Sequence, residues 1–483
     1  MTPIARHRLT PDLEISRILT GLWQMADQER DGRTFDLDGA AAAMRPYVAA
    51  GFTTFDMADH YGSAEEVVGR FRARPDARPM QALTKWVPEP GPISRADVRA
   101  AVDRARRRLG VERLDLLQFH AWSYTHPAWL DALAYLDECR REGSIGALGL
   151  TNTDTAHLRL VVESGIPIVS NQVCYSLLDQ RAAGAMAEYC ARKGIALLAF
   201  GTLAGGFLSD RWLGAPEPDW DRLSTWSQMK YGRFIRQVGG WEMLQRVLRT
   251  ARTIADRHGC SVANVACRAI LDAPAVAGVI VGARLGERAH LEDNAHLDAL
   301  RLDASDRAAL AETLATLAPI PGDCGDEYRR PPFLTASGDL SHHVASFPAP
   351  FPVVTAADGT RRALSGTAWE SFAGYSRAVR VGDRILVSGT TATHGDRPMG
   401  GDDAAAQACH ALDKIQGAIE SLGGTIDQVV RTRIFVKRIE DWEAVARVHG
   451  ARFAAVQPAN TLVRAELIGD AYLVEIEAEA IVR

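Results

Sequence analysis

Neither basic nor acidic residues are in large excess in this sequence. Lys and Arg number 55 against 60 Asp and Glu, which gives a formal net charge of −5 over 483 residues. Such a balance offers no broad electrostatic attraction to a nucleic-acid backbone or to anionic lipid. We therefore expect neither nucleic acid nor a membrane among the partners of this protein.

Long hydrophobic runs are also missing. No stretch of about 18 uncharged apolar residues occurs, so the sequence predicts no transmembrane helix. The first residues, MTPIARHRLTPDLEISRILTG, contain no continuous apolar segment of the kind that marks a secretory signal. These absences predict a soluble protein of the cytoplasm.

Cysteine is sparse and scattered. The chain has 7 cysteines, an odd number, and no C-x-x-C motif. A disulfide framework and a zinc knuckle both need paired or closely spaced cysteines. We expect reduced thiols that mostly pack in the interior, and no metal site.

The dinucleotide-binding motif G-x-G-x-x-G is absent from the first turn, which counts against an open doubly wound sheet. Short apolar runs instead alternate with amphipathic helical stretches about eight times, as where LDLLQFH precedes PAWLDALAYLDECRREG. Eight such units close a parallel barrel, so we predict an α/β fold, a (β/α)8 TIM barrel, with the open sheet as the alternative. A chain of this length is too long for one ordinary core, so a further domain is expected.

Polar residues follow the apolar runs at the points where five successive strands would end. They are Asp56, Lys85, His120, Asn152 and Gln172. In a parallel barrel the carboxyl ends of the strands meet at one mouth, which is where active sites of this architecture lie. We expect these five side chains to converge there.

One subset of these residues, with the nearby Tyr61, suits proton delivery to a carbonyl group. In FDMADHYG the carboxylate of Asp56 stands five positions before the phenol of Tyr61. A phenol has a usual pKa of about 10, but a nearby ammonium can lower that pKa by about 1–3 units. Lys85 would supply that charge, and Asp56 would keep Lys85 protonated. A neutral His120 would hydrogen-bond the substrate oxygen and orient it toward Tyr61.

These motifs resemble the aldo-keto reductase family. FDMADHYG, TKW, LQFH, GLTN and NQVCYS stand in the family's order over about residues 1–320. The family's catalytic tetrad is matched residue by residue, by Asp56, Tyr61, Lys85 and His120. The resemblance implies a barrel that binds NADPH, or less often NADH, and transfers hydride to an aldehyde or ketone. Tyr61 would be the proton donor to this small-molecule carbonyl substrate.

The resemblance extends to the cofactor site. The residues matched to cofactor contacts are Gly21, Leu22, Trp23, Asp56, Thr151, Asn152, Gln172, Phe200, Gly201, Gly282, Ala283, Arg284, His290 and Asn294. Asn152 and Gln172 would hold the nicotinamide carboxamide, since an amide side chain offers both a donor and an acceptor. Phe200 would stack on the nicotinamide ring and fix which side presents its hydride.

The segment VGARLGERAHLEDN resembles the family's loop for the adenosine phosphate. Gly282 and Ala283 would be backbone donors, and Arg284 would be the phosphate partner. The spacing departs from the commoner pattern because extra residues precede Asn294, and His290 stands where the family often has a second basic residue. The preference for NADPH over NADH is therefore left open.

Aromatic residues mark a substrate pocket. Trp23, Trp86 and Trp122 follow the first, third and fourth strands, which would place three indoles on one rim. Ordinary loop packing is the alternative. The long segment APEPDWDRLSTWSQMKYGRFIRQVGGW would fold over cofactor or substrate, since loops of this length are usually functional or disordered.

Residues 321–361 connect the barrel, residues 1–320, to a different pattern. Their density of Pro, Gly and Asp indicates an irregular connection. The stretch GDCGDEYRR would alternatively cap the active site, since the resembled family uses C-terminal loops to shape specificity. Both possibilities stay open.

Residues 362–483 show strand and helix patterns of a compact α+β domain. GYSRAV, LVSGTTA, VVRTRIFVK, PANTLV and VEIEAEA resemble the reactive-intermediate deaminase (Rid, or YjgF) family. That resemblance implies a chorismate-mutase-like fold and a homotrimer with ligand clefts between subunits. Tyr375, Ser388, Asn460 and Glu475 match cleft positions, but Asn460 stands where the deaminating members carry an arginine for the substrate carboxylate.

Three functions follow from these resemblances. The first is an NADPH-dependent carbonyl reductase fused to a domain that makes it a homotrimer. The second is a bifunctional enzyme whose C-terminal domain handles an imine or enamine. The third is a slow-turnover binding module that senses the nicotinamide cofactor. The intact tetrad favours the first.

Overall fold

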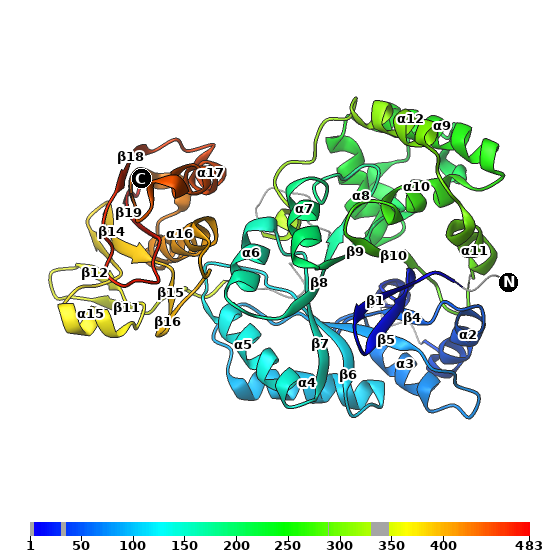
Figure 1. Cartoon of the computed structure of the whole chain (residues 1–483), viewed down its shortest axis with the longest axis horizontal. Coiled ribbons are helices and arrows are strands. Elements are labelled where there is room, and N and C mark those ends of the chain that lie inside the picture. The colour runs from blue at the N-terminus through cyan, green and yellow to red at the C-terminus, as the bar shows by residue number, and fades with distance from the viewer. Residues whose placement is uncertain (1–3, 30–34, 288, 330–346) are drawn as a thin grey trace.

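The computed structural model describes residues 4–29, 35–287, 289–329 and 347–483. Its larger part is a closed barrel of eight parallel strands in the order β10-β3-β4-β5-β6-β7-β8-β9 (Figure 1). The strands are β3 (Ile18–Gly21), β4 (Thr54–Asp56), β5 (Gln81–Trp86), β6 (Leu114–Phe119), β7 (Ile145–Thr151), β8 (Ile168–Cys174), β9 (Ala196–Phe200) and β10 (Val276–Gly282). The predicted (β/α)8 fold is confirmed.

The barrel interior is filled by apolar side chains from successive strands. Leu19, Leu83, Leu116 and Leu198 are fully buried and belong to one cluster. An antiparallel N-terminal hairpin of β1 (Arg6–Thr10) and β2 (Leu13–Ser16) adds Leu13 and Ile15 to that cluster. The hairpin therefore closes the bottom of the barrel, and the opposite end is left for function.

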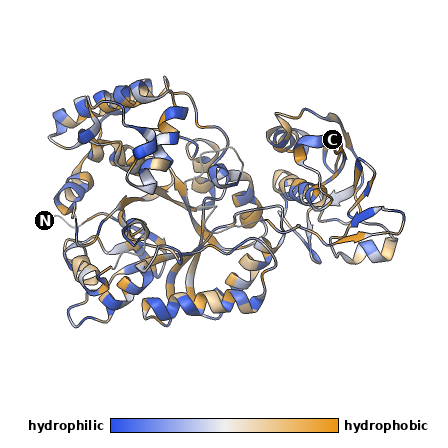
Figure 2. Cartoon of the chain, turned by 180° about the vertical axis from the view of Figure 1, so that it is seen from behind, coloured by the Kyte–Doolittle hydropathy of each residue, from blue (hydrophilic) through white to orange (hydrophobic). Residues whose placement is uncertain are grey.

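Helices surround the barrel, with polar residues toward solvent and apolar residues toward the strands (Figure 2). They are α2 (Leu37–Ala49), α3 (Ala64–Arg72), α4 (Arg95–Leu109), α5 (Ala128–Arg141), α6 (Thr155–Glu163), α7 (Ala185–Lys193), α10 (Val262–Leu271) and α11 (Leu291–Ala299). Local sequence explains their ends. Ser94 and Asp97 form a capping box at the start of α4, and Gly110 ends it in a left-handed conformation with φ 65°.

The chain makes a long excursion between β9 and β10. It contains short 3-10 turns at Ala204–Gly206, Asp210–Trp212 and Trp220–Arg222, followed by α8 (Trp226–Gln237) and α9 (Trp241–His258). These elements and α12 (Ala304–Leu314) share a second hydrophobic cluster that includes Phe207, Phe234 and Leu248. The small helix α1 (Gln24–Gln28) follows β3 at the same end of the barrel.

The chain then returns to the barrel mouth in α13 (Asp326–Arg329). Arg329 donates to the backbone oxygens of Ala121 at 2.9 Å and Asn152 at 2.5 Å, so this part of the connection lies against two loops of the mouth. The alternative prediction, that residues 321–361 form an irregular connection, concerns mainly residues 330–346, which lie outside the described residues.

The C-terminal domain is a seven-stranded sheet with its two longer helices on one face. Its strand order is β11-β12-β13-β14-β19-β17-β18, and its neighbours are antiparallel except β17 and β18. The strands are β11 (Val353–Thr355), β12 (Arg361–Ala363), β13 (Ala378–Val381), β14 (Arg384–Thr391), β17 (Val429–Val436), β18 (Ala459–Arg464) and β19 (Val474–Ile481), with a separate pair β15 (Thr393–His394) and β16 (Arg397–Pro398). The helices are α15 (Ala368–Ala373), α16 (Ala404–Ser421) and α17 (Trp442–Phe453). This confirms the predicted smaller α+β domain.

Helix α16 joins the two parts of the molecule, since it packs on α6 of the barrel (Figure 1). Every one of the 7 cysteines is a free thiol, and six of them are buried. Among the described helices, none is long and apolar enough to span a membrane.

Candidate functional site

A cavity of about 990 Å3 opens at the carboxyl end of the barrel strands. Its lining comes from the strand ends, from the excursion after β9, from the loop after β10 and from α13. The cavity holds all five polar residues predicted to converge at the strand ends: Asp56, Lys85, His120, Asn152 and Gln172. It also holds Tyr61.

Asp56 and Lys85 form a buried ion pair at the base of this cavity. Lys85 Nζ donates to both carboxylate oxygens of Asp56 at 2.8 Å and to the backbone oxygen of Met57 at 2.9 Å. These bonds use the three hydrogens of the ammonium. Burial lowers the pKa of Lys85, and the charge and hydrogen bonds of Asp56 oppose that effect.

Tyr61 lies beside this pair, on the loop that follows β4. Lys85 Nζ is 4.7 Å from the centre of the phenol ring. The ring is held edge-on by Trp23 at 4.9 Å and His60 at 4.8 Å between centroids. At this distance the positive charge of the ammonium favours the ionised form of the phenol.

His120 directly follows β6 and is buried, with its ring edge-on to Trp122 at 4.4 Å between centroids. Burial and the nearby Arg329 hold the pKa of His120 well below its usual range, so the ring is neutral. Its Nδ1 lies 3.3 Å from the backbone oxygen of Thr151, which can only accept, so Nδ1 carries the hydrogen. Nε2 is then an acceptor, and it is buried with no partner among the described residues.

The amides predicted to hold a carboxamide differ in their surroundings. Gln172 Nε2 donates to Asp56 Oδ1 at 2.6 Å, so this nitrogen belongs to the charge network of the ion pair. Asn152 has a left-handed backbone, φ 53°, and its side-chain oxygen is buried with no partner in the described part of the chain. An orphaned amide oxygen at a cavity wall suits a donor such as the amide group of nicotinamide. Phe200, Gly201 and Thr151 line the same cavity.

The predicted cofactor contacts of the first strand separate into two kinds. Gly21 and Trp23 line the cavity. The side chain of Leu22 is fully buried in the core and its N–H donates to the backbone oxygen of Asp56 at 2.9 Å, so a cofactor contact of Leu22 stays a prediction that concerns its backbone oxygen.

The loop after β10 forms the far end of the cavity. Gly282, Arg284, His290 and Asn294 line it. The N–H of Ala283 donates to the backbone oxygen of Gly21 at 3.0 Å, so it serves the barrel and not a phosphate as predicted. Arg284 donates to Glu287 at 3.4 Å and Gln24 at 3.4 Å. Gly282 has open space where a side chain would stand, with Gln24 nearest at 3.8 Å.

Two of the three predicted indoles face the cavity. Trp23 and Trp122 line it, whereas Trp86 packs against Phe119 in the hydrophobic core with ring centres 5.7 Å apart. Trp86 and Lys85 are consecutive in β5, so their side chains point to opposite faces of the barrel wall. Trp86 is therefore not among the residues that line this cavity.

Two further wall residues were not singled out from the sequence. Lys230 of α8 is buried, and it hydrogen-bonds the hydroxyl of Tyr328 of α13. Its Nζ also lies 5.0 Å from the centre of the Phe200 ring. Tyr328 is edge-on to His120 with ring centres 5.5 Å apart. Both residues lie in segments predicted to cover the site, QMKYGRF and GDCGDEYRR, but nothing in those segments distinguished them from their neighbours.

The predicted cleft residues of the C-terminal domain do not all meet. Arg377 connects two of them, because it donates to the hydroxyl of Tyr375 at 3.2 Å and to the backbone oxygen of Ser388 at 3.3 Å, and it also donates to the backbone oxygen of Gly389 at 2.7 Å. A Cβ on Gly389 would lie 2.0 Å from Glu475, so that carboxylate is adjacent. Asn460 lies on β18, beyond β19 and β17, and its amide is 3.4 Å from His449 of α17.

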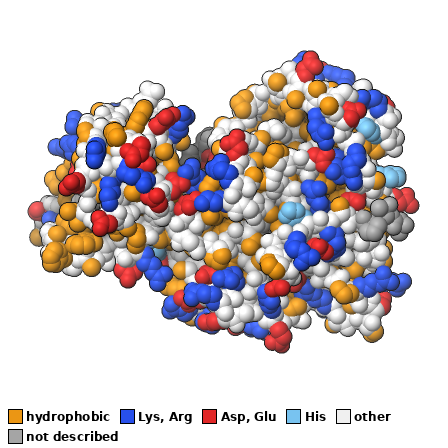
Figure 3. All heavy atoms as spheres, in the orientation of Figure 1, with side chains coloured by type: hydrophobic (Ala, Val, Ile, Leu, Met, Phe, Trp, Pro, Cys, Tyr) orange, Lys and Arg blue, Asp and Glu red, His pale blue; other side chains and the backbone are white. Residues whose placement is uncertain are grey.

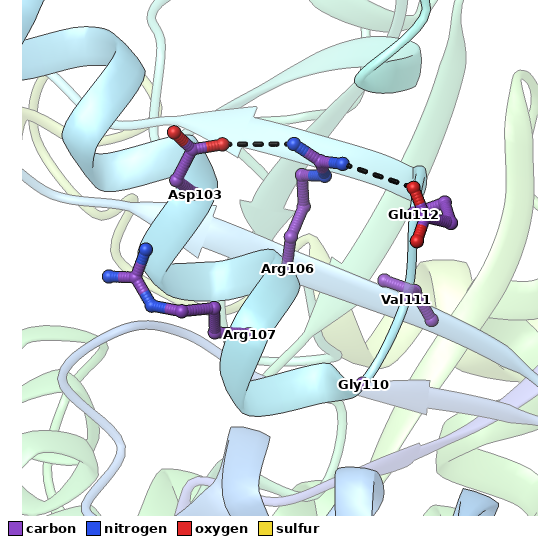
Figure 4. Close-up of a pocket in the computed structure, with 6 residues that line it drawn as sticks. All are labelled: Asp103, Arg106, Arg107, Gly110, Val111 and Glu112. Atoms are coloured by element: carbon purple, nitrogen blue, oxygen red, sulfur yellow. Dashed lines mark hydrogen bonds and ion pairs between the residues drawn. The ribbon is translucent and has the colours of Figure 1, made fainter.

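Two other features lie outside the cavity. A hollow of about 370 Å3 at the end of α4 is lined by Arg106 and its ion-pair partners Asp103 and Glu112 (Figure 4). At the domain interface, His157, Cys409 and Asp413 have possible ligand atoms within 4.8 Å of one another. Both ring nitrogens of His157 are already bonded to carboxylates there.

Comparison with known proteins matches two families to the chain. The model of the Aldo/keto reductase family matches residues 17–315. The model described as Endoribonuclease L-PSP, the family of the Rid and YjgF proteins, matches residues 365–482.

Individual relatives cover one part or the other. Flagellar radial spoke protein 5 of Chlamydomonas reinhardtii is 30% identical over 302 residues, which are 53% of this chain and 57% of that protein. An uncharacterized protein of Streptomyces coelicolor is 39% identical over 124 residues, 26% of this chain and 92% of its own. The solved glycerol dehydrogenase of Gluconobacter oxydans has 22% identity and a TM-score of 0.53, and covers 66% of this chain and 97% of its own. That structure supports the barrel fold alone.

Proposed function

Because the chain belongs to the aldo/keto reductase family over residues 17–315, we propose that this oxidoreductase reduces an aldehyde or ketone with NADPH or NADH, and that Tyr61 donates the proton. The observation that carries the proposal is the ammonium of Lys85, fixed by Asp56 at 4.7 Å from the Tyr61 ring. A positive charge held beside a phenol favours its ionised form and makes the phenol a usable acid near neutral pH.

The nicotinamide cofactor, when bound, supplies the hydride. Asn152 and the oxygen of Gln172 hold the carboxamide, and Phe200 supports the ring. Tyr61 delivers its proton to the substrate oxygen as that oxygen gains charge, and Lys85 stabilises the phenolate left behind. Gln172 and Gln118 support Asp56 through bonds of 2.6 Å and 3.4 Å, so the buried carboxylate keeps its charge for Lys85.

His120 takes part as a hydrogen-bonding group for the substrate oxygen. In the tautomer favoured by Thr151, Nε2 accepts from the hydroxyl of the alcohol. A carbonyl oxygen needs the other tautomer, in which Nδ1 gives up its 3.3 Å contact with Thr151. Bonds of that length are weak, so the exchange costs little.

An apolar carbonyl compound with a ring or chain is the substrate class that fits the wall. Trp23 and Trp122 offer flat apolar faces, and Tyr328 with Lys230 offers a polar corner on the same side as His120. The coenzyme is NADPH in this proposal, with NADH as the alternative, because Arg284 can exchange Glu287 for a phosphate. Free thiols and the charge balance support a location in the cytoplasm.

The test follows NADPH and NADH consumption by the purified protein across a panel of aldehydes and ketones. Tyr61→Phe should bind cofactor about as well as the parent protein and lose most turnover, because it removes the proton donor and keeps the ring. Tyr135→Phe is the matched control, since Tyr135 lies on α5 against Arg95, outside the cavity. Largely unchanged turnover in Tyr61→Phe would show that the tetrad assignment is wrong.

For the C-terminal domain we propose assembly into a homotrimer. Helices α16 and α17 cover one face of its sheet, and the barrel packs on α16, which leaves the other sheet face for a partner. Leu386 and Val463 are exposed at 43% and 42%, and Trp369 and Phe372 of α15 at 53% and 83%. Figure 3 shows hydrophobic side chains gathered at the end of the molecule where Figure 1 places α15. Burial of such surfaces between subunits is a common basis of closed symmetry.

Hydrolysis of imines has weaker support, because Asn460 lacks the charge that would bind a carboxylate and lies away from Tyr375, Ser388 and Glu475 within one chain. Light scattering on the full chain tests the assembly. We expect a trimer that Leu386→Asp dissociates, while the control Arg447→Ala on the outer side of α17 leaves it intact. A parent protein that is monomeric or dimeric would show the assembly proposal to be wrong.

A further inference from the structure

A buried chain of charged groups crosses the boundary between the two domains. Arg452 of α17 donates to Asp413 Oδ1 of α16 at 2.6 Å, and Asp413 Oδ2 lies 2.9 Å from Nε2 of His157 in α6. The other ring nitrogen of His157 lies 2.7 Å from Asp154. His157, Asp154 and Asp413 are all buried. The ring is thus shared between a carboxylate of the barrel and a carboxylate of the C-terminal domain.

The barrel end of this chain is the turn that carries Asn152. Asp154 caps α6 by accepting from the N–H of His157 at 2.9 Å, two residues after Asn152. The left-handed backbone of Asn152 is unusual for a residue with a side chain, so the surrounding contacts must hold it. Arg329 holds its carbonyl from one side at 2.5 Å. The hydrogen bonds between Asp154 and His157 hold the other end of the same turn.

The loop that carries His120 and Trp122 is also supported by His157 and by α16. Tyr124 stacks on the His157 ring with centroids 3.4 Å apart and planes 12° apart. One turn further along α16, Gly417 approaches Thr125 so closely that a Cβ would lie 2.6 Å from its backbone oxygen. A glycine inside a helix lowers helix stability, and here its small size permits this contact.

We infer that the C-terminal domain is a working part of the reductase site, in which Asp413 acts through His157 and Asp154 to position Asn152 for the nicotinamide. Asp413 is a positioning residue, since it touches neither substrate nor cofactor. The inference rests on the proposed contact between Asn152 and the carboxamide.

Because Asp413, His157 and Asp154 are buried, the bonds between them would act on the turn at Asn152 more strongly than apolar packing would. A buried charge that loses its partner is strongly destabilised, so the remaining groups rearrange or admit water. Asp413→Asn keeps the shape of the side chain and removes its charge. The His157 ring would then follow Asp154 alone, and the cap of α6 and the turn before it would relax.

The experiment measures NADPH affinity of the full-length protein by quenching of tryptophan fluorescence. Asp413→Asn should weaken NADPH binding about 3- to 10-fold, a range typical of coupling through contacts of this kind. Turnover at saturating NADPH should fall less than the affinity does, because Lys85 and Asp56 are held by their own ion pair. In an Asn152→Ala background the same substitution should have no further effect, since the group it positions is absent.

The control is Arg159→Ala. Arg159 also lies on α6 and bonds the C-terminal domain through Asp403 at 3.0 Å, but its side chain is partly exposed and its bond goes to Asp403 and not to Asp154, the residue that caps α6. We expect unchanged NADPH affinity for this variant. His157→Gln, which can bond only one of the two carboxylates at a time, should reproduce the effect of Asp413→Asn if the latter folds poorly.

The outcomes separate the inference from the proposed function. If Asn152→Ala weakens NADPH binding and Asp413→Asn and His157→Gln do not, the positioning role is refuted and the reductase proposal stands. Equal effects of Asp413→Asn in the parent and Asn152→Ala backgrounds also refute it. If Asn152→Ala leaves affinity unchanged, the carboxamide contact is wrong and the inference fails with it.

Discussion

Replacement of Lys85 by Met tests the central feature of the site, a single ammonium that serves both stability and chemistry. Methionine fills a similar volume and removes the charge. It also removes the bonds of 2.8 Å to each oxygen of Asp56 and of 2.9 Å to Met57. Asp56 would keep only the amide donors Gln172 and Gln118.

The stability effect follows from that unpaired carboxylate. Breaking a buried ion pair by removing one partner costs about 3–5 kcal/mol. The double variant Lys85→Met with Asp56→Asn removes both charges, so it should regain most of the lost unfolding free energy. It should not regain activity, since the charge beside Tyr61 is still missing.

The catalytic effect follows from the distance between Lys85 and Tyr61. With the 4.7 Å between Nζ and the ring centre taken as the scale of the separation, an ammonium and a phenolate attract by about 3.5 kcal/mol at an effective dielectric constant of about 20. The ammonium favours the phenolate, so its removal raises the pKa of Tyr61. The alkaline limb of the residual activity, where Tyr61 loses its proton, should therefore move to higher pH.

The assay is the pH profile of kcat/KM for the parent protein, Lys85→Met and the double variant, with thermal unfolding recorded alongside. We expect low residual activity in both variants and an alkaline limb displaced upward. An undisplaced limb would refute the role of Lys85 in tuning Tyr61. A double variant no more stable than Lys85→Met would refute the account of the stability loss.

Three further predictions concern the cofactor and the C-terminal domain. Arg284→Ala should weaken the binding of NADPH more than that of NADH, because only the phosphorylated cofactor loses a charge-assisted pair. Glu287→Gln should have the opposite effect on NADPH binding. Equal weakening of both cofactors in a fluorescence titration would show that another residue contacts the phosphate. Gly325→Ala should weaken both cofactors alike, since a Cβ there would lie 2.0 Å from the backbone oxygen of Asn152, and unchanged titrations would contradict this. Burial and the neighbouring Lys414 lower the pKa of His410 to about 3. Below about pH 6.5 this histidine is protonated in the unfolded chain and neutral in the folded chain. The free energy of unfolding therefore falls as the pH is lowered from about 6.5 to 3. His410→Leu should flatten that fall in melting temperature, and an equal slope in both proteins would contradict the assignment.

The barrel and the convergence of polar side chains at its mouth were predictable because both depend on local patterns. Apolar runs in regular alternation with amphipathic helices specify parallel strands, and the ends of those strands meet wherever the barrel closes. Asp56 is last in β4, Lys85 is next to last in β5 and His120 directly follows β6, so their convergence followed from topology alone.

Residues outside that repeat were harder to predict. Trp86 was misplaced because a one-residue step along β5 moves a side chain from the mouth to the core, and the sequence alone did not fix that register. Lys230 and Tyr328 reach the cavity through segments without periodicity, so no pattern distinguished them. His157 and Asp413 are 256 positions apart and each looks like an ordinary helix residue, so only tertiary structure brings them together.

Tyr328 reaches the cavity from chain that has already left the barrel. Arg181 holds this segment in place by donating to Glu327 at 2.7 Å and to the backbone oxygen of Asp323 at 2.9 Å. The proposed reacting groups and one wall of the cavity are therefore encoded in separate stretches of the gene. Under the proposed function, recombination at a point just after Ile320 would exchange that wall and leave Asp56, Tyr61, Lys85 and His120 intact, so the range of substrates could diversify while the chemistry is inherited unchanged.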